Sequence, residues 1–68
     1  MIEVDTKGLS CPEPVLMVQD ALKDHPKDTI RVESDRATPR DNIIKLAERS
    51  GRKASYVEQG DIFVITIE

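Results

Sequence analysis

The chain has 68 residues, too few for two hydrophobic cores, so residues 1–68 are expected to form a single domain. With 38% hydrophobic and 34% charged residues, its composition is typical of a small soluble globule and not of a disordered tail. The net charge of −3 and the aromatic content of 3% argue against a nucleic-acid surface, and no apolar run approaches the ~20 residues that span a bilayer.

The N-terminal half of the chain predicts a strand, a helix and a second strand. Residues 2–5 alternate apolar and polar side chains, as a half-buried strand does. After a short loop, apolar residues recur at helical spacing up to about Asp24, and two prolines in the first turn place the helix start at Cys11 or Pro12. Residues 29–34 alternate again and predict the second strand.

A second helix is predicted in the C-terminal half. Thr38 is expected to be its N-cap, with Pro39 at the first helical position and Asp41 as the acid three residues after the cap. Ser50 and Gly51 are expected to end the helix, because glycine readily adopts the left-handed conformation found at helix ends.

The last two predicted strands cover residues 53–58 and 61–67, joined by a hairpin turn at Gln59 and Gly60. The element order predicts an α+β fold, a two-layer α/β sandwich of order βαβαββ with two helices on one face of a four-stranded mixed sheet. Alternation in most strands indicates that the other face meets solvent. The run 62–65 is apolar on both faces, which fits either a central strand or a patch that docks a partner or a second copy.

The chain has one cysteine, Cys11, and one histidine, His25. A single cysteine excludes an internal disulfide and the two-cysteine chemistry of disulfide oxidoreductases. The two residues also cannot supply the four ligands of a structural zinc site, so no metal is expected. An unpaired thiol and an N-terminus without a signal peptide favour a cytoplasmic location.

Cys11 stands directly before the predicted first helix, and a helix N-terminus favours the thiolate, the reactive form of the side chain. Pro12 and Pro14 stiffen this turn and lack N–H groups, which leaves the Glu13 amide as the donor near the sulfur. The Glu13 carboxylate opposes thiolate formation. His25 lies near the other end of the helix, roughly 20 Å away at ~1.5 Å per residue, too far to act as a base.

Two interpretations of Cys11 follow from these residues. It is either a small buried hydrophobe at a helix start or a thiol that accepts a group, such as persulfide sulfur, and passes it on. Asp35 and Arg40 are further candidates, because each falls at the end of a predicted element, where sites collect. Both could equally be ordinary solvated charges.

Residues 8–15 (GLSCPEPV) resemble the Cys-Pro-x-Pro signature of the TusA-like sulfur carriers, a family that includes SirA-like and YedF-like proteins. Residues 35–41 (DRATPRD) resemble the family's loop before the second helix, and the resemblance covers nearly the whole chain. It implies the two-layer α/β fold and a covalent persulfide on Cys11, with no other cofactor. It also implies that Asp35 and Arg40 lie near the site and assist partner contact or transfer.

The resemblance further implies a sulfurtransferase-type carrier that depends on partner proteins. The donor would be a cysteine desulfurase or a rhodanese-like enzyme, and the acceptor would be another protein, with no direct contact to nucleic acid, membrane or metal. Transfer RNA thiolation is one possible pathway, although Gln19 and Asp20 stand where the best-known members carry basic residues. A selenium-metabolism variant of the carrier, and a non-catalytic interaction or regulatory module, remain as alternatives.

Overall fold

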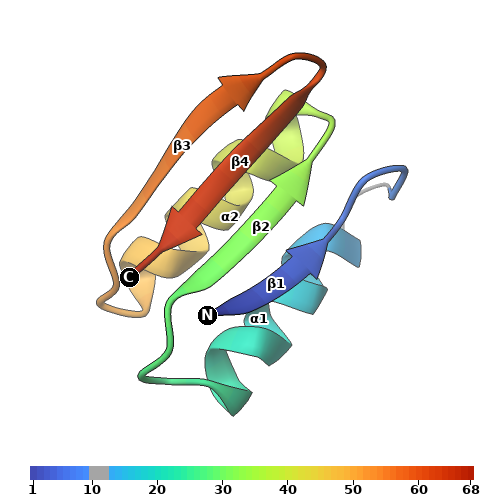
Figure 1. The fold of residues 1–68 in the computed structure, drawn as a ribbon. Helices are drawn as coiled ribbons and strands as arrows, with labels where there is room; N and C mark the ends of the chain where they lie inside the picture. Colours follow the sequence, from blue (N-terminus) through green and yellow to red (C-terminus); the bar gives the residue numbers. More distant parts are fainter. Residues whose placement is uncertain (10–12) are drawn as a thin grey trace.

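Within residues 1–9 and 13–68, which this computed structural model describes, strands and helices follow the predicted order βαβαββ (Figure 1). Each strand boundary falls within one residue of its prediction. The strands are β1 (Ile2–Asp5), β2 (Ile30–Ser34), β3 (Ala54–Gln59) and β4 (Ile62–Ile67), and the helices are α1 (Glu13–Asp24) and α2 (Ala37–Arg49).

The described strands form one mixed sheet in the order β1-β2-β4-β3. β1 pairs with β2 in parallel, whereas β4 pairs antiparallel with both β2 and β3. β4 therefore lies inside the sheet, which confirms that its continuous apolar run is that of a central strand. Successive side chains of a strand point to opposite faces, and Val64 and Ile65 of β4 are both buried, so this strand has apolar contacts on both of its faces.

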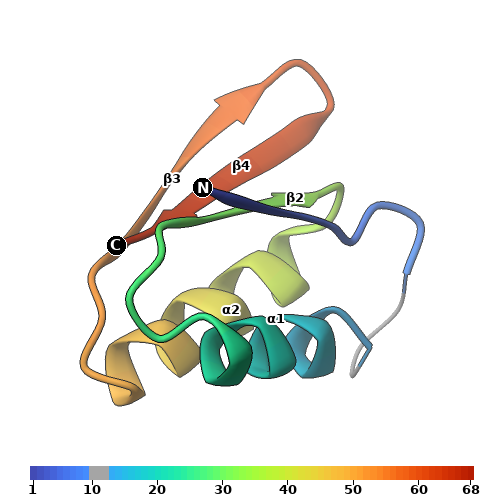
Figure 2. The same ribbon diagram turned by 60° about the horizontal axis from the view of Figure 1, so that its bottom comes forward.

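Both helices cover the same face of the sheet, and the opposite face is left open (Figure 2). The register places Ile30 and Val32 of β2 opposite Ile67 and Ile65 of β4, so these four side chains share the helix-facing side. Burying each such side chain contributes roughly 1.5–3 kcal/mol. The core cluster comprises Val18, Leu22, Ile30, Val32, Ile43, Ala47, Ile65 and Ile67.

The start of α2 differs from the prediction. Arg36 is the N-cap residue and Ala37 the first helical residue, so Thr38 is not the cap and Pro39 occupies the third helical position. The cause lies in Ser34, whose hydroxyl donates to the Arg36 carbonyl at 3.0 Å and accepts from the Arg36 N–H at 3.3 Å. Proline is still tolerated at the third position, because N–H groups of the first turn have no partner within a helix.

The predicted end of α2 at Ser50 and Gly51 is confirmed. Ser50 is the C-cap, and Gly51 follows it with φ of 78°. The Gly51 N–H donates to the Glu48 carbonyl and the Arg52 N–H to the Ala47 carbonyl, both at 3.0 Å. These two bonds form a Schellman motif, which satisfies carbonyl groups that the helix leaves unpaired.

The hairpin turn lies one residue later than predicted. Gln59 still pairs with Ile62, so the two loop residues are Gly60 and Asp61 instead of Gln59 and Gly60. Gly60 has φ of 60° and occupies the first central position, which tight hairpin turns of the primed types fill with a residue of positive φ.

The parallel pairing of β1 and β2 determines which loops meet. Both strands point toward the same edge of the sheet, so the loop before α1 and the loop before α2 leave from that edge (Figure 1). The N-terminal ends of both helices and the β3–β4 turn lie at this end of the molecule, whereas both chain termini lie at the other (Figures 1 and 2). We refer to it as the loop end.

Candidate functional site

Four of the sequence-predicted site residues, Glu13, Pro14, Asp35 and Arg40, lie at the loop end. Cys11 and Pro12, and with them the predicted helix start, lie outside the described residues. Glu13 is exposed as the first residue of α1, where a carboxylate interacts favourably with the helix dipole. Pro14 is fully buried and faces the core, so it contributes packing as well as a restricted helix start.

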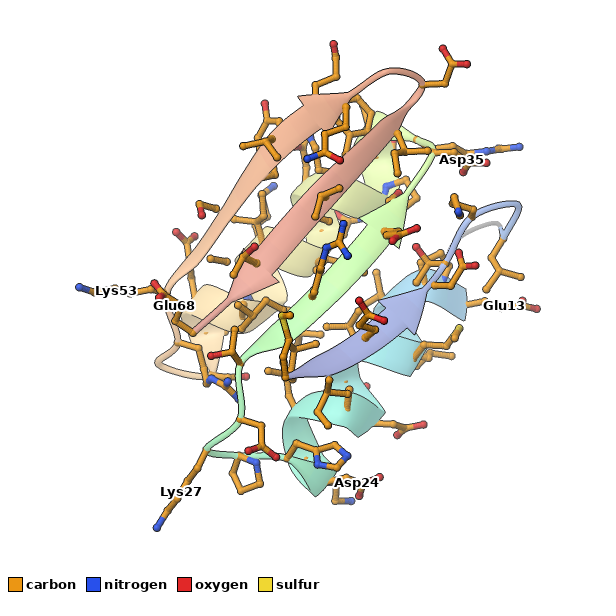
Figure 3. The ribbon with its side chains drawn as sticks, in the orientation of Figure 1. Glu13, Asp24, Lys27, Asp35, Lys53 and Glu68 are labelled. Atoms are coloured by element: carbon orange, nitrogen blue, oxygen red, sulfur yellow. The ribbon has the colours of Figure 1, made fainter. Side chains whose placement is uncertain are left out.

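Asp35 follows β2 directly and contacts the loop before α1. Its carboxylate Oδ2 accepts a hydrogen bond from the Gly8 N–H at 3.0 Å, across 27 residues of sequence. Figure 3 shows Asp35 at the loop end, beside the chain that leaves β1. Gly8 stands three residues before Cys11 in the sequence. The structure therefore brings Asp35 to Gly8, in the loop that precedes the cysteine in the sequence, whereas a role of Asp35 in the site stays a prediction.

Three neighbouring residues that sequence analysis did not single out reinforce this contact. Thr6 is 1% exposed, and its N–H and hydroxyl both donate to the Glu33 carbonyl, at 2.9 and 2.6 Å. Lys7 Nζ lies 3.0 Å from Glu33 Oε1. Hydrogen bonding to Glu33, followed by the charge of Asp5, raises the pKa of Lys7 above its usual 10.5. No local motif marks these residues, because their proximity depends on the register of β1 against β2.

Arg40 lies elsewhere at the loop end, packed against the β3–β4 hairpin. Its guanidinium carbon is 4.3 Å from the centroid of the Tyr56 ring and 4.6 Å from that of Phe63. Nη2 is 2.9 Å from Asp41 Oδ1, and the Arg40 side chain is only 16% exposed. Within the described part of the chain, the contacts of Arg40 join α2 to the hairpin and those of Asp35 join the two loops.

His25 lies one residue beyond α1, at the opposite end of the helix from Glu13, where Nδ1 is 3.3 Å from Asp28 Oδ2. Among residues 1–9 and 13–68, no group of three or more His, Cys, Asp or Glu side chains is placed to hold a metal ion. No helix in this part of the chain has the length and apolar character needed to cross a membrane.

Comparison with known proteins agrees with this architecture. The family model described as sulfurtransferase TusA matches residues 2–68. A crystal structure of a SirA-like protein from Desulfitobacterium hafniense shares 31% sequence identity and superposes with a TM-score of 0.92, covering 98% of this chain and 95% of that one. None of the curated proteins matches the chain. With the α/β sandwich and the family resemblance both confirmed, the chain belongs to the TusA family of sulfurtransferases.

Proposed function

We propose that this protein carries sulfur as a persulfide on Cys11, receiving it from a donor enzyme and delivering it to an acceptor protein. The observation that carries the proposal is membership of the TusA family over residues 2–68. The sequence Cys-Pro-Glu-Pro at 11–14 supports it, because the only thiol of the chain stands two residues before Glu13, the first residue of α1. Anions are favoured at a helix N-terminus, typically by 0.3–1 kcal/mol.

The transfer balances without a redox partner. The Cys11 thiolate attacks the outer sulfur of a persulfide on the donor, the donor's S–S bond breaks, and the electron pair leaves with the donor thiolate. The product is a persulfide on Cys11, whose outer sulfur an acceptor nucleophile attacks in the same way, restoring the Cys11 thiolate. His25 lies at the far end of α1 from Glu13, so we expect the partners to supply any acid or base.

The partners are therefore a sulfur-donor protein, such as a cysteine desulfurase or a rhodanese-like enzyme, and a sulfur-acceptor protein. Gln19 and Asp20 are exposed on α1, so the helix that follows the cysteine is not a basic surface at these positions. This supports delivery to a protein and not directly to a nucleic acid. We place the relay in the cytoplasm, where an unpaired thiol stays reduced.

Persulfide loading tests the proposal directly. The protein is incubated with a cysteine desulfurase and cysteine, and its intact mass is recorded before and after treatment with a thiol reductant. We expect the gain of one sulfur atom, which the reductant removes, and no gain in Cys11→Ala. The absence of an adduct with several active donors, including a rhodanese-like enzyme with thiosulfate, would contradict the proposal and favour a non-catalytic interaction module.

A further inference from the structure

Three consecutive residues fasten the loop before α1 to the end of β2. Thr6 donates two hydrogen bonds to the Glu33 carbonyl, Lys7 forms an ion pair with the Glu33 carboxylate, and the Gly8 N–H donates to Asp35. We call this set of contacts the loop clasp. Thr6 and Glu33 continue the parallel pairing of β1 with β2, whereas the Gly8–Asp35 bond joins two loops beyond the sheet.

The turn that contains Gly8 is closed only weakly by its own hydrogen bond. Its internal hydrogen bond, from the Leu9 N–H to the Thr6 carbonyl, is long at 3.3 Å. Gly8 has φ of 79°, the value of the third residue of a type II turn, and glycine has more alternative conformations than any other residue. The bond from Gly8 to Asp35 therefore restrains the residue of the turn that has the most alternative conformations.

The chain on the C-terminal side of the Cys-Pro-Glu-Pro segment is also restrained, by packing of α1. Pro14 and Val18 of α1 are fully buried, so packing against the sheet determines where the helix begins. The chain thus enters the segment from a turn restrained by Asp35 and leaves it in a helix restrained by the core. The Asp35 carboxylate is exposed and bonds a neutral backbone N–H, an interaction that needs an acceptor oxygen and not a negative charge.

We propose that Asp35 is a positioning residue, which acts by holding the 6–9 turn through the Gly8 N–H and so sets how the chain enters the cysteine segment. The resemblance implies a different role, in which Asp35 assists partner contact or transfer. This inference rests on the proposed function in one respect only, namely that a change at Asp35 would also affect sulfur transfer. The hydrogen bond and its effect on the turn are properties of the free protein.

Three variants separate positioning from charge. Asp35→Ala removes both the acceptor and the charge, and Asp35→Asn removes the charge but keeps an acceptor oxygen. Asp24→Ala is the control, because it removes one negative charge at the opposite end of the molecule (Figure 3). Hydrogen exchange of the Gly8 amide is measured by NMR, and the alkylation rate of Cys11 is measured as a function of pH. Thermal unfolding confirms that each variant is folded.

We expect Asp35→Ala to accelerate exchange of the Gly8 amide about fivefold, the effect of losing one exposed hydrogen bond. The same variant should also change the pH profile of Cys11 alkylation. Asp35→Asn should restore both measurements to near the wild-type values, and Asp24→Ala should change neither.

Two results would overturn the proposal. If Asp35→Ala leaves the Gly8 amide and the Cys11 alkylation profile unchanged, the bond does not position the turn. If Asp35→Asn alters Cys11 alkylation as strongly as Asp35→Ala while the Gly8 amide stays protected, the charge of Asp35 is what matters. Neither measurement requires persulfide loading, so failure of the carrier hypothesis is seen separately, as wild-type protein that gains no sulfur.

Discussion

Arg40 contacts two aromatic rings in addition to the Asp41 carboxylate. Tyr56 and Phe63 pack edge to face, with ring centroids 5.9 Å apart and an angle of 78° between the ring planes. The Arg40 guanidinium lies within 5 Å of both centroids, as a planar cation over aromatic faces does. The chain contains one tyrosine, one phenylalanine and no tryptophan, so both of its aromatic side chains contact this arginine.

We therefore expect Arg40→Lys to destabilise the protein by about 1 kcal/mol, because an ammonium keeps the charge but lacks the planar surface that packs on the rings. Urea unfolding measures the change. Arg49→Lys is the matched control, since Arg49 is exposed in the last turn of α2, and it should stay within about 0.5 kcal/mol of wild type. Equal effects of the two substitutions would show that the aromatic contacts of Arg40 add nothing to stability.

Glu13 provides a second residue-scale prediction, on reactivity. Its carboxylate is exposed at the start of α1, two residues after Cys11 in the sequence. A negative charge near a thiol opposes formation of the thiolate. Glu13→Gln should raise the alkylation rate of Cys11 at neutral pH about twofold, the size of a solvent-screened charge interaction. Glu48→Gln near the end of α2 is the control. A slower reaction in Glu13→Gln would mean that the carboxylate assists the thiol.

At the scale of elements, contacts outside the helix itself determine where α2 begins. The residues around Thr38 and Pro39 have the pattern of a capped helix start, yet the Ser34 hydroxyl holds Arg36 and the helix begins two residues earlier than that pattern predicts. Ser34 is 1% exposed at the end of β2, so the sheet supplies the polar group that organises the turn into the helix.

We expect Ser34→Ala to cost about 1–2 kcal/mol of unfolding free energy, because it removes both hydrogen bonds of a buried hydroxyl. Thr38→Ala is the matched control and should change stability by less than about 0.5 kcal/mol, because its side chain is exposed and does not cap α2. Both are compared by urea unfolding. A larger loss in Thr38→Ala than in Ser34→Ala would restore Thr38 as the residue that organises the helix start.

The ion pair of the loop clasp makes stability depend on pH. Lys7 has a raised pKa because the folded protein places it beside Glu33, so folding favours its protonated form. Its contribution is present in full below the usual lysine pKa of 10.5 and is lost as the pH rises through the raised value. The stability difference between wild type and Lys7→Gln should therefore shrink above this pH and also in high salt. A difference that is constant across this range would exclude the ion pair as its cause.

At the scale of the whole molecule, Arg52 joins separate segments of the chain at the end opposite the loop end. Its guanidinium donates to the carbonyl of Glu68 at 2.9 Å, to that of His25 at 3.2 Å and to that of Asp28. It thereby connects the end of β4 with the segment between α1 and β2, which are far apart in the sequence. The two layers are thus held together by the core, by Arg40 at the loop end and by Arg52 at the terminal end.

Arg52→Lys should lower the unfolding free energy by about 2 kcal/mol, because one ammonium cannot reach three carbonyl groups arranged around a planar guanidinium. Lys53→Ala, at an exposed neighbouring position, should have little effect in the same urea titration. If the two variants have the same stability, the three carbonyl contacts of Arg52 do not stabilise the fold. Cys11 alkylation should be unchanged in both, since Arg52 lies at the other end of the molecule.

Local patterns were sufficient for the sequence to predict much of this protein. Alternation in the strands, helical spacing of apolar residues and the Ser50–Gly51 stop determined the element order, and the residues around Cys11 and Asp35 indicated the family. These features depend on residues a few positions apart, so they can be recognised from the sequence alone. The sheet order was not visible in this way, because strand pairing depends on contacts between distant segments.

Only the tertiary structure decided what the site residues contact. The parallel register of β1 and β2 brings Asp35 to Gly8 and Thr6 to Glu33, and packing of α2 on the hairpin brings Arg40 to its aromatic neighbours. Each of these contacts joins residues at least 16 positions apart and depends on the exact alignment of strands that the side-chain pattern alone does not encode. Sequence determined which residues stand near the cysteine along the chain, and three-dimensional packing determined which distant residues contact the turn that precedes it.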